Sequence, residues 1–337
     1  MKRRALLVGV AASLAAPSAW LPARAAAAGF DTLDFDWADA PRRRPVPARL
    51  YLPRHAAPGA PVPLAVFSHG IGSTRERYRW FGQHLAEQGI ACLHPQHVGS
   101  DRQVWMGNPL ALVGRLWDAA HEAEAVARVA DLRFALDTLL TGELGTRLDD
   151  QRIVLAGHSY GANTTLLSVG AQVQREGRAI ALRDERARAA IVLSAPPFYG
   201  EGDPQRILGG IAVPSLHVTA TEDVIRIPGY YSGAEDRLAV YRATGSARKW
   251  LAVFEGGSHS IFTDRPGAGG LTLNPQVKEA TRVLALAFLR AVFDGDDSAL
   301  AAWPQRWAAI LARFEASSAL AAAAHRGRAQ PFALTAA

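Results

Sequence analysis

The stretch Ile153-Val-Leu-Ala-Gly-His-Ser-Tyr-Gly-Ala-Asn-Thr-Thr-Leu166 decides the fold class of this chain. It opens with an apolar run, continues into a serine held between two glycines, and ends in residues that suit the start of a helix. A strand, a sharp turn and a helix are the context that gives a G-x-S-x-G sequence its meaning. We therefore predict that Ser159 lies at the C-terminal edge of a sheet, where the following helix N-terminus favours negative charge. The alternative interpretation is an ordinary glycine-rich turn between a strand and a helix.

Other apolar runs and one helical pattern extend this prediction along the chain. Most of the runs are continuous rather than alternating, as in strands buried on both faces of a sheet. The predicted strands are 48–52, 63–68, 90–94, 152–156, 190–194, 215–219 and 250–254. The helical pattern consists of Val126, Val129, Leu132, Leu136 and Leu139. Alternation of strands and helices predicts an α/β fold with a mostly parallel, doubly wound sheet and helices on both faces.

Three segments depart from this regular alternation. Residues 101–122 and 196–210 carry apolar residues without a clean period, and we expect the first to be an inserted lid or pocket wall. Near the C-terminus, Trp303, Trp307, Ile310, Leu311 and Phe314 are predicted to form one face of a helix.

The first residues are typical of an export signal. Residues 1–25 combine a basic start, a short apolar segment rich in small residues and an Ala-x-Ala pattern, so we expect a periplasmic or secreted protein. Arg3-Arg4 suggests the twin-arginine route, and an uncleaved anchor is the alternative. We expect one catalytic domain over 26–316, without a stable membrane span, followed by an Ala-rich tail over 317–337.

Charge and cysteine content exclude several classes of protein. Residues 1–25 hold four basic residues and no acidic ones, so the net charge of +6 becomes +6 − 4 = +2 without them. No basic run remains to suggest a nucleic-acid surface; we interpret Arg42-Arg43-Arg44 as a solvated turn. With Cys92 as the single cysteine there is no intrachain disulfide, and its apolar neighbours indicate a buried hydrophobic position.

A serine hydroxyl needs a base and an orienting acid before it can act as a nucleophile. On a sheet with a G-x-S-x-G turn the acid and the histidine follow the serine in that order, each after a later strand. Asp223 follows the strand at 215–219 and is preferred to Glu222, and His259 follows the strand at 250–254. Of the other two histidines after Ser159, His217 is expected in the core and His325 in the tail.

The same chemistry needs two backbone N–H groups that can bind an oxyanion. One is the N–H of Tyr160, the residue after the serine, and the second comes from the loop after an early strand. Ser68-His-Gly-Ile-Gly72 follows such a strand, which makes the N–H of Ile71 the second predicted donor. His69 could be taken for a catalytic base, but we expect it to brace this loop by hydrogen bonds.

With these residues in order, the chain resembles the α/β-hydrolase superfamily, and within it the bacterial predicted dienelactone hydrolases and platelet-activating-factor acetylhydrolase-like esterases. Further similar segments are Arg44–Pro53, Ser68–Ser73 and Arg128–Asp137. The resemblance covers about residues 31–312 and implies the α/β-hydrolase fold and ester hydrolysis without a cofactor or metal. Dienelactone hydrolases have a cysteine where this chain has Ser159, so that substrate is not implied. Secreted polyester hydrolases share the order of motifs but often carry disulfides, and polyester cleavage is not favoured.

Several other residues have competing interpretations. His94 and His97, with Asp101, have the spacing of a metal site, but Pro95 disfavours the helix that would align them, so we expect these histidines to line the pocket or brace the loop. The segment His121–Glu124 is interpreted as a solvated helix. We consider three aromatic residues as possible walls of an acyl pocket, with packing as the alternative: Trp105, Trp117 and Phe262.

The sequence therefore predicts an exported serine hydrolase acting on a small-molecule or lipid-like ester, with Ser159, His259 and Asp223 as its catalytic residues. The alternatives are acyl transfer, or amide or thioester cleavage, by the same residues, and a binding protein on an inactive hydrolase scaffold. Acyl-chain length and oligomeric state stay open at this stage.

Overall fold

The computed structural model describes residues 29–54, 60–180, 182–227, 229–264 and 270–317. The predictions for residues 1–25, for His325 and for residues 318–337 of the tail lie outside the described residues.

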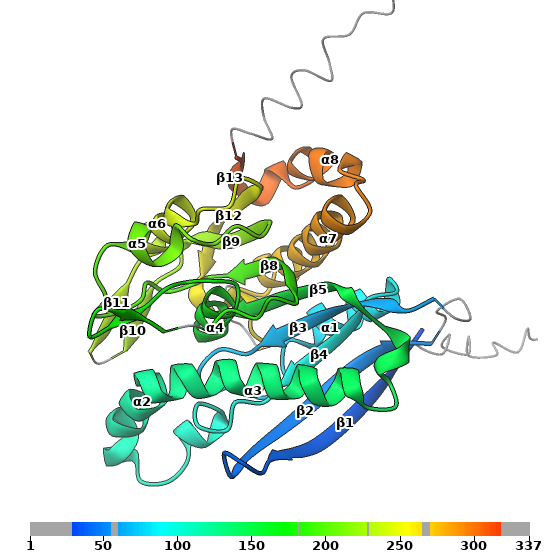
Figure 1. Ribbon diagram of the computed structural model, residues 1–337. Helices are drawn as coiled ribbons and strands as arrows, with labels where there is room; N and C mark the ends of the chain where they lie inside the picture. Colours follow the sequence, from blue (N-terminus) through cyan, green and yellow to red (C-terminus); the bar gives the residue numbers. More distant parts are fainter. Residues whose placement is uncertain (1–28, 55–59, 181, 228, 265–269, 318–337) are drawn as a thin grey trace, which may run out of the picture.

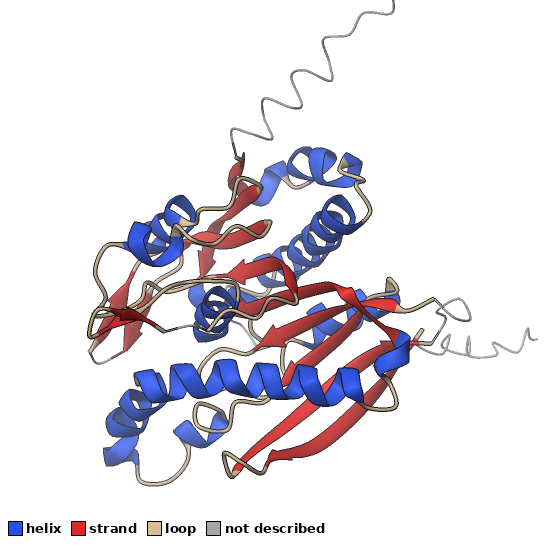
Figure 2. Cartoon of the chain, in the orientation of Figure 1, coloured by secondary structure: helices blue, strands red, loops and turns tan. Residues whose placement is uncertain are grey.

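One large sheet forms the centre of the described chain (Figures 1 and 2). Its nine strands, in spatial order, are β1 (Phe30–Asp39), β2 (Arg44–Pro53), β4 (Ala91–Pro95), β3 (Val62–Ser68), β5 (Leu148–His158), β8 (Ala187–Leu193), β9 (Ser215–Glu222), β12 (Lys249–Ser258) and β13 (Leu311–Ala316). The six strands from β4 to β12 run parallel, whereas β1, β2 and β13 pair antiparallel at the two edges. Two short ribbons lie outside the sheet: β6 (Gln174–Arg175) with β7 (Arg178–Ala179), and β10 (Ile225–Ile227) with β11 (Tyr230–Ser232).

Helices cover both faces of this sheet (Figure 1). On one face α1 (Arg79–Glu87), α7 (Leu273–Phe293) and α8 (Ser298–Arg306) pack into one apolar cluster. On the other face a second cluster includes residues of α3 (Glu122–Thr141), α4 (Tyr160–Ser168), α5 (Pro204–Leu208) and α6 (Ala234–Ala243). The strands between them are buried on both sides, which explains their continuous apolar runs. The chain is thus an α/β protein with a mostly parallel sheet, compatible with a doubly wound fold.

The seven strands predicted from apolar runs are all present, but two edge strands were missed. In β1 the side chains alternate in burial along its length, a pattern that a search for continuous runs overlooks. The prediction of one helical face from Trp303 to Phe314 is wrong. The helix α8 ends at Arg306, a 3₁₀ turn follows, and Leu311–Ala316 then adds to β12 as strand β13. Adding this strand gives the exposed backbone groups of β12 hydrogen-bond partners, which local periodicity cannot reveal.

The irregular segment 101–122 forms two 3₁₀ turns, Arg102–Trp105 and Pro109–Ala111, followed by α2 (Leu112–Ala120). It leads into the N-terminus of α3, beside the C-terminal ends of the parallel strands. Cys92 is buried in β4, as predicted, and is a free thiol. None of the helices that the structure describes is long and apolar enough to cross a membrane.

Candidate active site

The backbone at Ser159 adopts the strained turn that the sequence predicts. Ser159 lies between the end of β5 and the first residue of α4, with φ of 56° and ψ of −124°. A positive φ is unfavourable for a residue with a Cβ, so the surrounding structure must hold it. A Cβ at Gly157 would overlap the carbonyl of Gly161, and one at Gly161 would overlap the carbonyl of Ser68. The two glycines therefore allow the turn, the helix and β3 to approach closely.

A continuous chain of hydrogen bonds runs from Ser159 to two later loops. The Oγ of Ser159 lies 2.8 Å from Nε2 of His259, and Nδ1 of His259 lies 2.7 Å from Oδ1 of Asp223. Because the carboxylate can only accept, Nδ1 carries the proton and Nε2 is free to accept from the serine hydroxyl. The structure thus brings together three predicted residues whose positions span 100 residues of sequence.

Asp223 is buried and held in its ionised form. Its Oδ2 accepts a hydrogen bond of 2.7 Å from the hydroxyl of Thr219, and Nε of Arg237 lies 3.3 Å from Oδ1. Burial by itself would raise the pKa of Asp223, but the hydrogen bond and charge of His259 and the charge of Arg237 together bring this pKa well below its usual value. Glu222, the alternative acid, is exposed and forms no hydrogen bond to His259 within the described chain.

Two backbone N–H groups lie next to Ser159 without a protein acceptor. Ile71 follows β3 and Tyr160 is the first residue of α4, and both line the same cavity as Ser159. Within the described ranges neither N–H donates to a backbone or side-chain oxygen. Unpaired N–H groups at a helix start and in an adjacent loop are the type of donor that stabilises an oxyanion.

Buried histidines brace the loop that carries Ile71. Nδ1 of His69 lies 2.8 Å from the carbonyl of Gly70, and its Nε2 accepts from the backbone N–H of His97 at 3.1 Å. His97 in turn contacts the hydroxyl of Ser68 and the carboxylate of Asp131, both at 3.2 Å. These contacts bear out the expectation that His69 and His97 have a bracing role. His94 contacts the thiol of Cys92, and no group of residues in the described part of the chain could hold a metal ion.

His158, which precedes the serine, connects the turn to the other two loops. Its Nε2 donates to the carbonyl of His259 at 3.0 Å, because a carbonyl can only accept, and its Nδ1 then accepts from the hydroxyl of Tyr78 at 2.9 Å. The oxygen of Tyr78 accepts from the N–H of Gly70 at 3.4 Å. Burial lowers the pKa of His158 to about 3, so the ring stays neutral and keeps this tautomer. No pattern in the sequence indicated a role for this histidine.

Arg128 is a second residue whose role sequence reasoning missed. It is completely buried, and its guanidinium donates to the carbonyl of His69 at 2.5 Å, the hydroxyl of Ser100 at 2.7 Å and the hydroxyl of Thr164 at 2.8 Å. The same group lies 4.5 Å from the ring centre of Tyr160. One side chain of α3 therefore connects the Ile71 loop to the helix that begins after Ser159.

Two predictions about charged residues near Arg128 are wrong: the solvated turn at Arg42–Arg44 and the solvated helix at His121–Glu124. Arg42 and Arg44 are not in a solvated turn, because both pair with the buried carboxylate of Asp131 at 2.8 Å. Glu124 is not on a solvated helix face either, since it is buried and pairs with Arg44 at 3.0 Å. The tight turn between β1 and β2 places these arginines over α3, a contact between distant segments that local sequence does not show.

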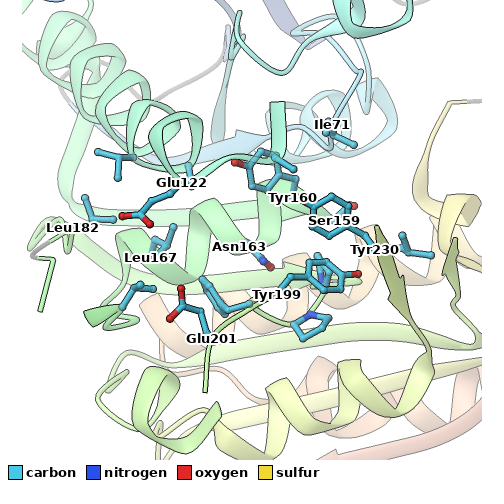
Figure 3. A pocket seen from close by; sticks show the side chains of 18 of the residues that line it. Ile71, Glu122, Ser159, Tyr160, Asn163, Leu167, Leu182, Tyr199, Glu201 and Tyr230 are labelled. Atoms are coloured by element: carbon cyan, nitrogen blue, oxygen red, sulfur yellow. The ribbon is translucent and has the colours of Figure 1, made fainter. Parts of the chain in front are cut away.

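None of the three aromatic residues considered as possible pocket walls lines the cavity next to Ser159, and for Phe262 the packing alternative is confirmed. Phe262 is fully buried in the core, and Trp117 is largely exposed. Trp105 donates to the carbonyl of Gly72 and lines a different cleft. An apolar cavity of about 200 Å³ lies next to Ser159 and is lined in part by other aromatic residues. Two of them, Phe198 and Tyr199, follow β8, and the third, Tyr230, is the first residue of β11. In Figure 3, Ser159 and Tyr230 lie toward one end of this cavity and Leu182 toward the other.

Charged side chains line the far end of the cavity, and one buried polar atom without a partner lies on its wall. Arg175 pairs with Glu122 and with Glu201, each at 2.6 Å. Oδ1 of Asn163, on α4, is buried without a hydrogen-bond partner in the described structure. The segment 101–122 supplies part of the cavity wall through Leu116 and Ala120, as expected for it, and the segment 196–210 supplies another part. The cavity offers mainly apolar contacts.

Comparison with known proteins adds no family assignment. No protein-family model matches the chain, and a search of curated protein sequences finds no match. The geometry of the described residues therefore carries the functional argument.

Replacing Arg128 by methionine is expected to lower the free energy of unfolding by about 3–5 kcal/mol, because several buried acceptors lose their donor and a buried network loses a charge. Urea unfolding followed by fluorescence measures this loss. Arg133→Met, on the same helix but partly exposed, should change stability by about 0.5 kcal/mol or less. Equal stability of the two variants would contradict the anchoring role.

Proposed function

We propose that this protein is a serine hydrolase of the α/β-hydrolase fold that cleaves carboxylic esters. The observation that carries the proposal is the chain from Ser159 through His259 to buried Asp223, next to the unpaired N–H groups of Ile71 and Tyr160. The mostly parallel sheet, with the serine at a strand-to-helix turn, is consistent with that fold.

In the proposed reaction Oγ of Ser159 attacks the ester carbonyl carbon while Nε2 of His259 takes the hydroxyl proton. Asp223 holds the tautomer of His259 and stabilises the imidazolium that forms. The N–H groups of Ile71 and Tyr160 donate to the oxyanion of the tetrahedral intermediate. His259 then gives the proton to the departing alkoxide, leaving an acyl group on Ser159. Water attacks this acyl-enzyme by the same steps and releases the acid.

The apolar cavity sets the expected acyl group. An apolar cavity of about 150 Å³ is large enough for benzene. A cavity of about 200 Å³ therefore suits an acyl chain of roughly six to eight carbon atoms. Charged side chains from three separate segments, Glu122, Arg175 and Glu201, line the far end, so much longer apolar chains should be poor substrates.

The proposal is tested with 4-nitrophenyl esters of two to sixteen acyl carbons and with a fluorophosphonate probe. We expect hydrolysis with an optimum of kcat/KM near six to eight carbons, and covalent labelling of Ser159 located by peptide mass spectrometry. Ser159→Ala should remove both. Labelling at another residue, or esterase activity that persists in Ser159→Ala, would contradict the proposal. Hydrolysis only of amides or thioesters would change the substrate class, and transfer to an added alcohol would indicate an acyltransferase.

Filling the cavity should shift this optimum. Val126 lines the cavity from α3 and is only partly buried, so Val126→Phe is expected to move the optimum to about four carbons or fewer by shortening the space for the chain. Val113→Phe adds the same volume on α2 at a position outside the cavity and serves as the control. A profile that both variants leave unchanged would show that the acyl chain binds elsewhere.

A further inference from the structure

Ser159 lies between the apolar cavity and a second, larger cleft. This second cleft has a volume of about 760 Å³ and is lined by polar as well as apolar groups. Ser159, Ile71, Ile225 and Ile227 line both spaces, so the two meet at the serine. An ester bound at Ser159 can therefore place its two halves in two different environments.

The position of His259 indicates which half enters which space. His259 lines the second cleft but not the apolar cavity. In the proposed reaction its Nε2 gives a proton to the oxygen of the leaving alcohol, which must lie next to that nitrogen. Tyr160 and Asn163, on the other side of the serine, line only the apolar cavity. The acyl group thus fits the apolar cavity, and the alcohol fits the second cleft.

Four arginines from three separate segments converge on the second cleft. Arg77 and Arg79 flank the start of α1, Arg102 begins the 3₁₀ turn after β4, and Arg226 lies in β10. All four are exposed, and none of them forms an ion pair with a carboxylate in the described part of the chain. Their charges are therefore available to a ligand.

The other charged residues of the cleft do not cancel these four. Arg49 is already paired with Asp34 at 2.7 Å. Asp264 accepts from the N–H of Tyr78 at 2.7 Å and lies 3.7 Å from Lys278. Glu76 is exposed at the rim and is the remaining carboxylate among the described lining residues. The cleft therefore has a clear positive excess.

We propose that the alcohol portion of the substrate carries an anionic substituent, a carboxylate or a phosphate, which the second cleft binds through Arg77, Arg79, Arg102 and Arg226. This subsite rests on the proposed ester hydrolysis at Ser159 and names its substrate class: an ester of an apolar acid with an anionic alcohol. Guanidinium groups match both anions because each can donate two parallel hydrogen bonds. A cleft lined by one sign of charge also concentrates ions of the opposite sign and speeds their association.

The test compares esters that share an acyl group and differ only in charge. One pair is 4-nitrophenyl hexanoate and the same ester with a carboxylate ortho to the nitro group; a second is 4-(hexanoyloxy)benzyl alcohol and its phosphate. We expect kcat/KM for the anionic member, divided by that for its neutral partner, to be about 10 at low ionic strength and to fall toward 1 in about 1 M salt. The pair with the larger ratio identifies carboxylate or phosphate as the preferred anion. Ratios at or below 1 for both pairs at low salt would overturn the proposal.

Substitutions assign the effect to the cleft. If the four exposed arginines share the ten-fold ratio equally, each contributes about two-fold, so Arg102→Gln with Arg226→Gln should lower the anionic-to-neutral ratio by about three-fold. Arg206→Gln removes the same charge from an exposed position outside the cleft and should leave the ratio unchanged. An equal fall in the control, or no fall in the double variant, would show that these arginines are merely solvated surface groups.

A binding measurement separates this inference from the proposed function. Active protein without any preference for the anionic esters would overturn the subsite and leave ester hydrolysis standing. If no ester is cleaved, hydrolysis fails, and the subsite is judged by calorimetric titration of Ser159→Ala protein with 5-hydroxy-2-nitrobenzoate and with inorganic phosphate. Binding of either anion that the double arginine variant weakens supports the cleft as an anion site, and absence of binding overturns it.

Discussion

Ser159→Ala is expected to lower kcat for ester hydrolysis by about 10⁶-fold, the largest change in activity that a single substitution in this chain should produce. The reason is the contact of 2.8 Å between Oγ of Ser159 and Nε2 of His259, which gives the hydroxyl a base to accept its proton. Without the hydroxyl no acyl-enzyme can form, and a water molecule would have to attack the ester directly. The N–H groups of Ile71 and Tyr160 would still bind an oxyanion, so a small residual rate should remain.

The loss should not grow when further residues of the same chain of hydrogen bonds are replaced. Ser159→Ala with His259→Ala is expected to be no slower than Ser159→Ala, because the two groups act as one unit. Asp223→Asn alone should lower kcat by about 10⁴-fold, since an amide no longer fixes the tautomer of His259. Steady-state kinetics with 4-nitrophenyl hexanoate measures all three variants. Additive losses in the double variant would show that the two residues act in separate steps.

The second large effect concerns stability: the protein is expected to unfold near pH 5. Among the described residues, five histidines are almost completely buried, namely His69, His94, His97, His158 and His217. Burial lowers the pKa of His94, His158 and His217 to about 3. It lowers the pKa of His97 to about 4 and that of His69 well below its ordinary value. The folded protein therefore keeps these rings neutral in mildly acidic solution.

The sign of the effect follows from where the protons bind. In the unfolded chain these histidines have an ordinary pKa of about 6.5, so they take up protons below that pH while the folded chain does not. The contribution of the neutral, buried histidines to the free energy of unfolding is fully present above about pH 7. It is lost as the pH falls below 6.5 toward the lowered pKa values of the folded protein. Below pH 6.5 each histidine lowers the free energy of unfolding by roughly 1.4 kcal/mol per pH unit. At pH 5, which is 1.5 units lower, the five histidines together lower it by about 10 kcal/mol. This is comparable to the whole stability of a typical domain, about 5–15 kcal/mol.

Urea unfolding at several pH values between 8 and 5 measures this dependence. The slope of the free energy of unfolding against pH should approach the value for five more protons bound by the unfolded than by the folded protein near pH 5. His217→Gln, in β9 and outside the loops that carry Ser159, Asp223 and His259, should reduce the slope by the equivalent of about one proton. His121→Gln changes an exposed histidine and should leave the slope as it is. Stability that stays level from pH 8 to 5 would show that the buried rings are already charged or become hydrated.

The main elements of the fold and the geometry of the site were accessible from local patterns. Seven strands followed from continuous apolar runs, because strands buried on both faces must be apolar throughout. Ser159, Asp223 and His259 followed from the order in which a serine turn, an acid and a histidine come after successive strands. The edge strands β1 and β13 were missed for different reasons. The side chains of β1 alternate in burial, and β13 follows soon after a helix, α8, that ends at Arg306.

The sequence by itself thus determined the residues that meet at the serine, because parallel strands bring their C-terminal ends to one edge of a sheet whatever the details of packing. Only the tertiary structure decided how that edge is supported and what surrounds it. Arg128 and His158 connect loops that are far apart in sequence, and the arginines of the second cleft come from three segments. Such contacts depend on how helices and loops pack in space, and local periodicity carries no record of them.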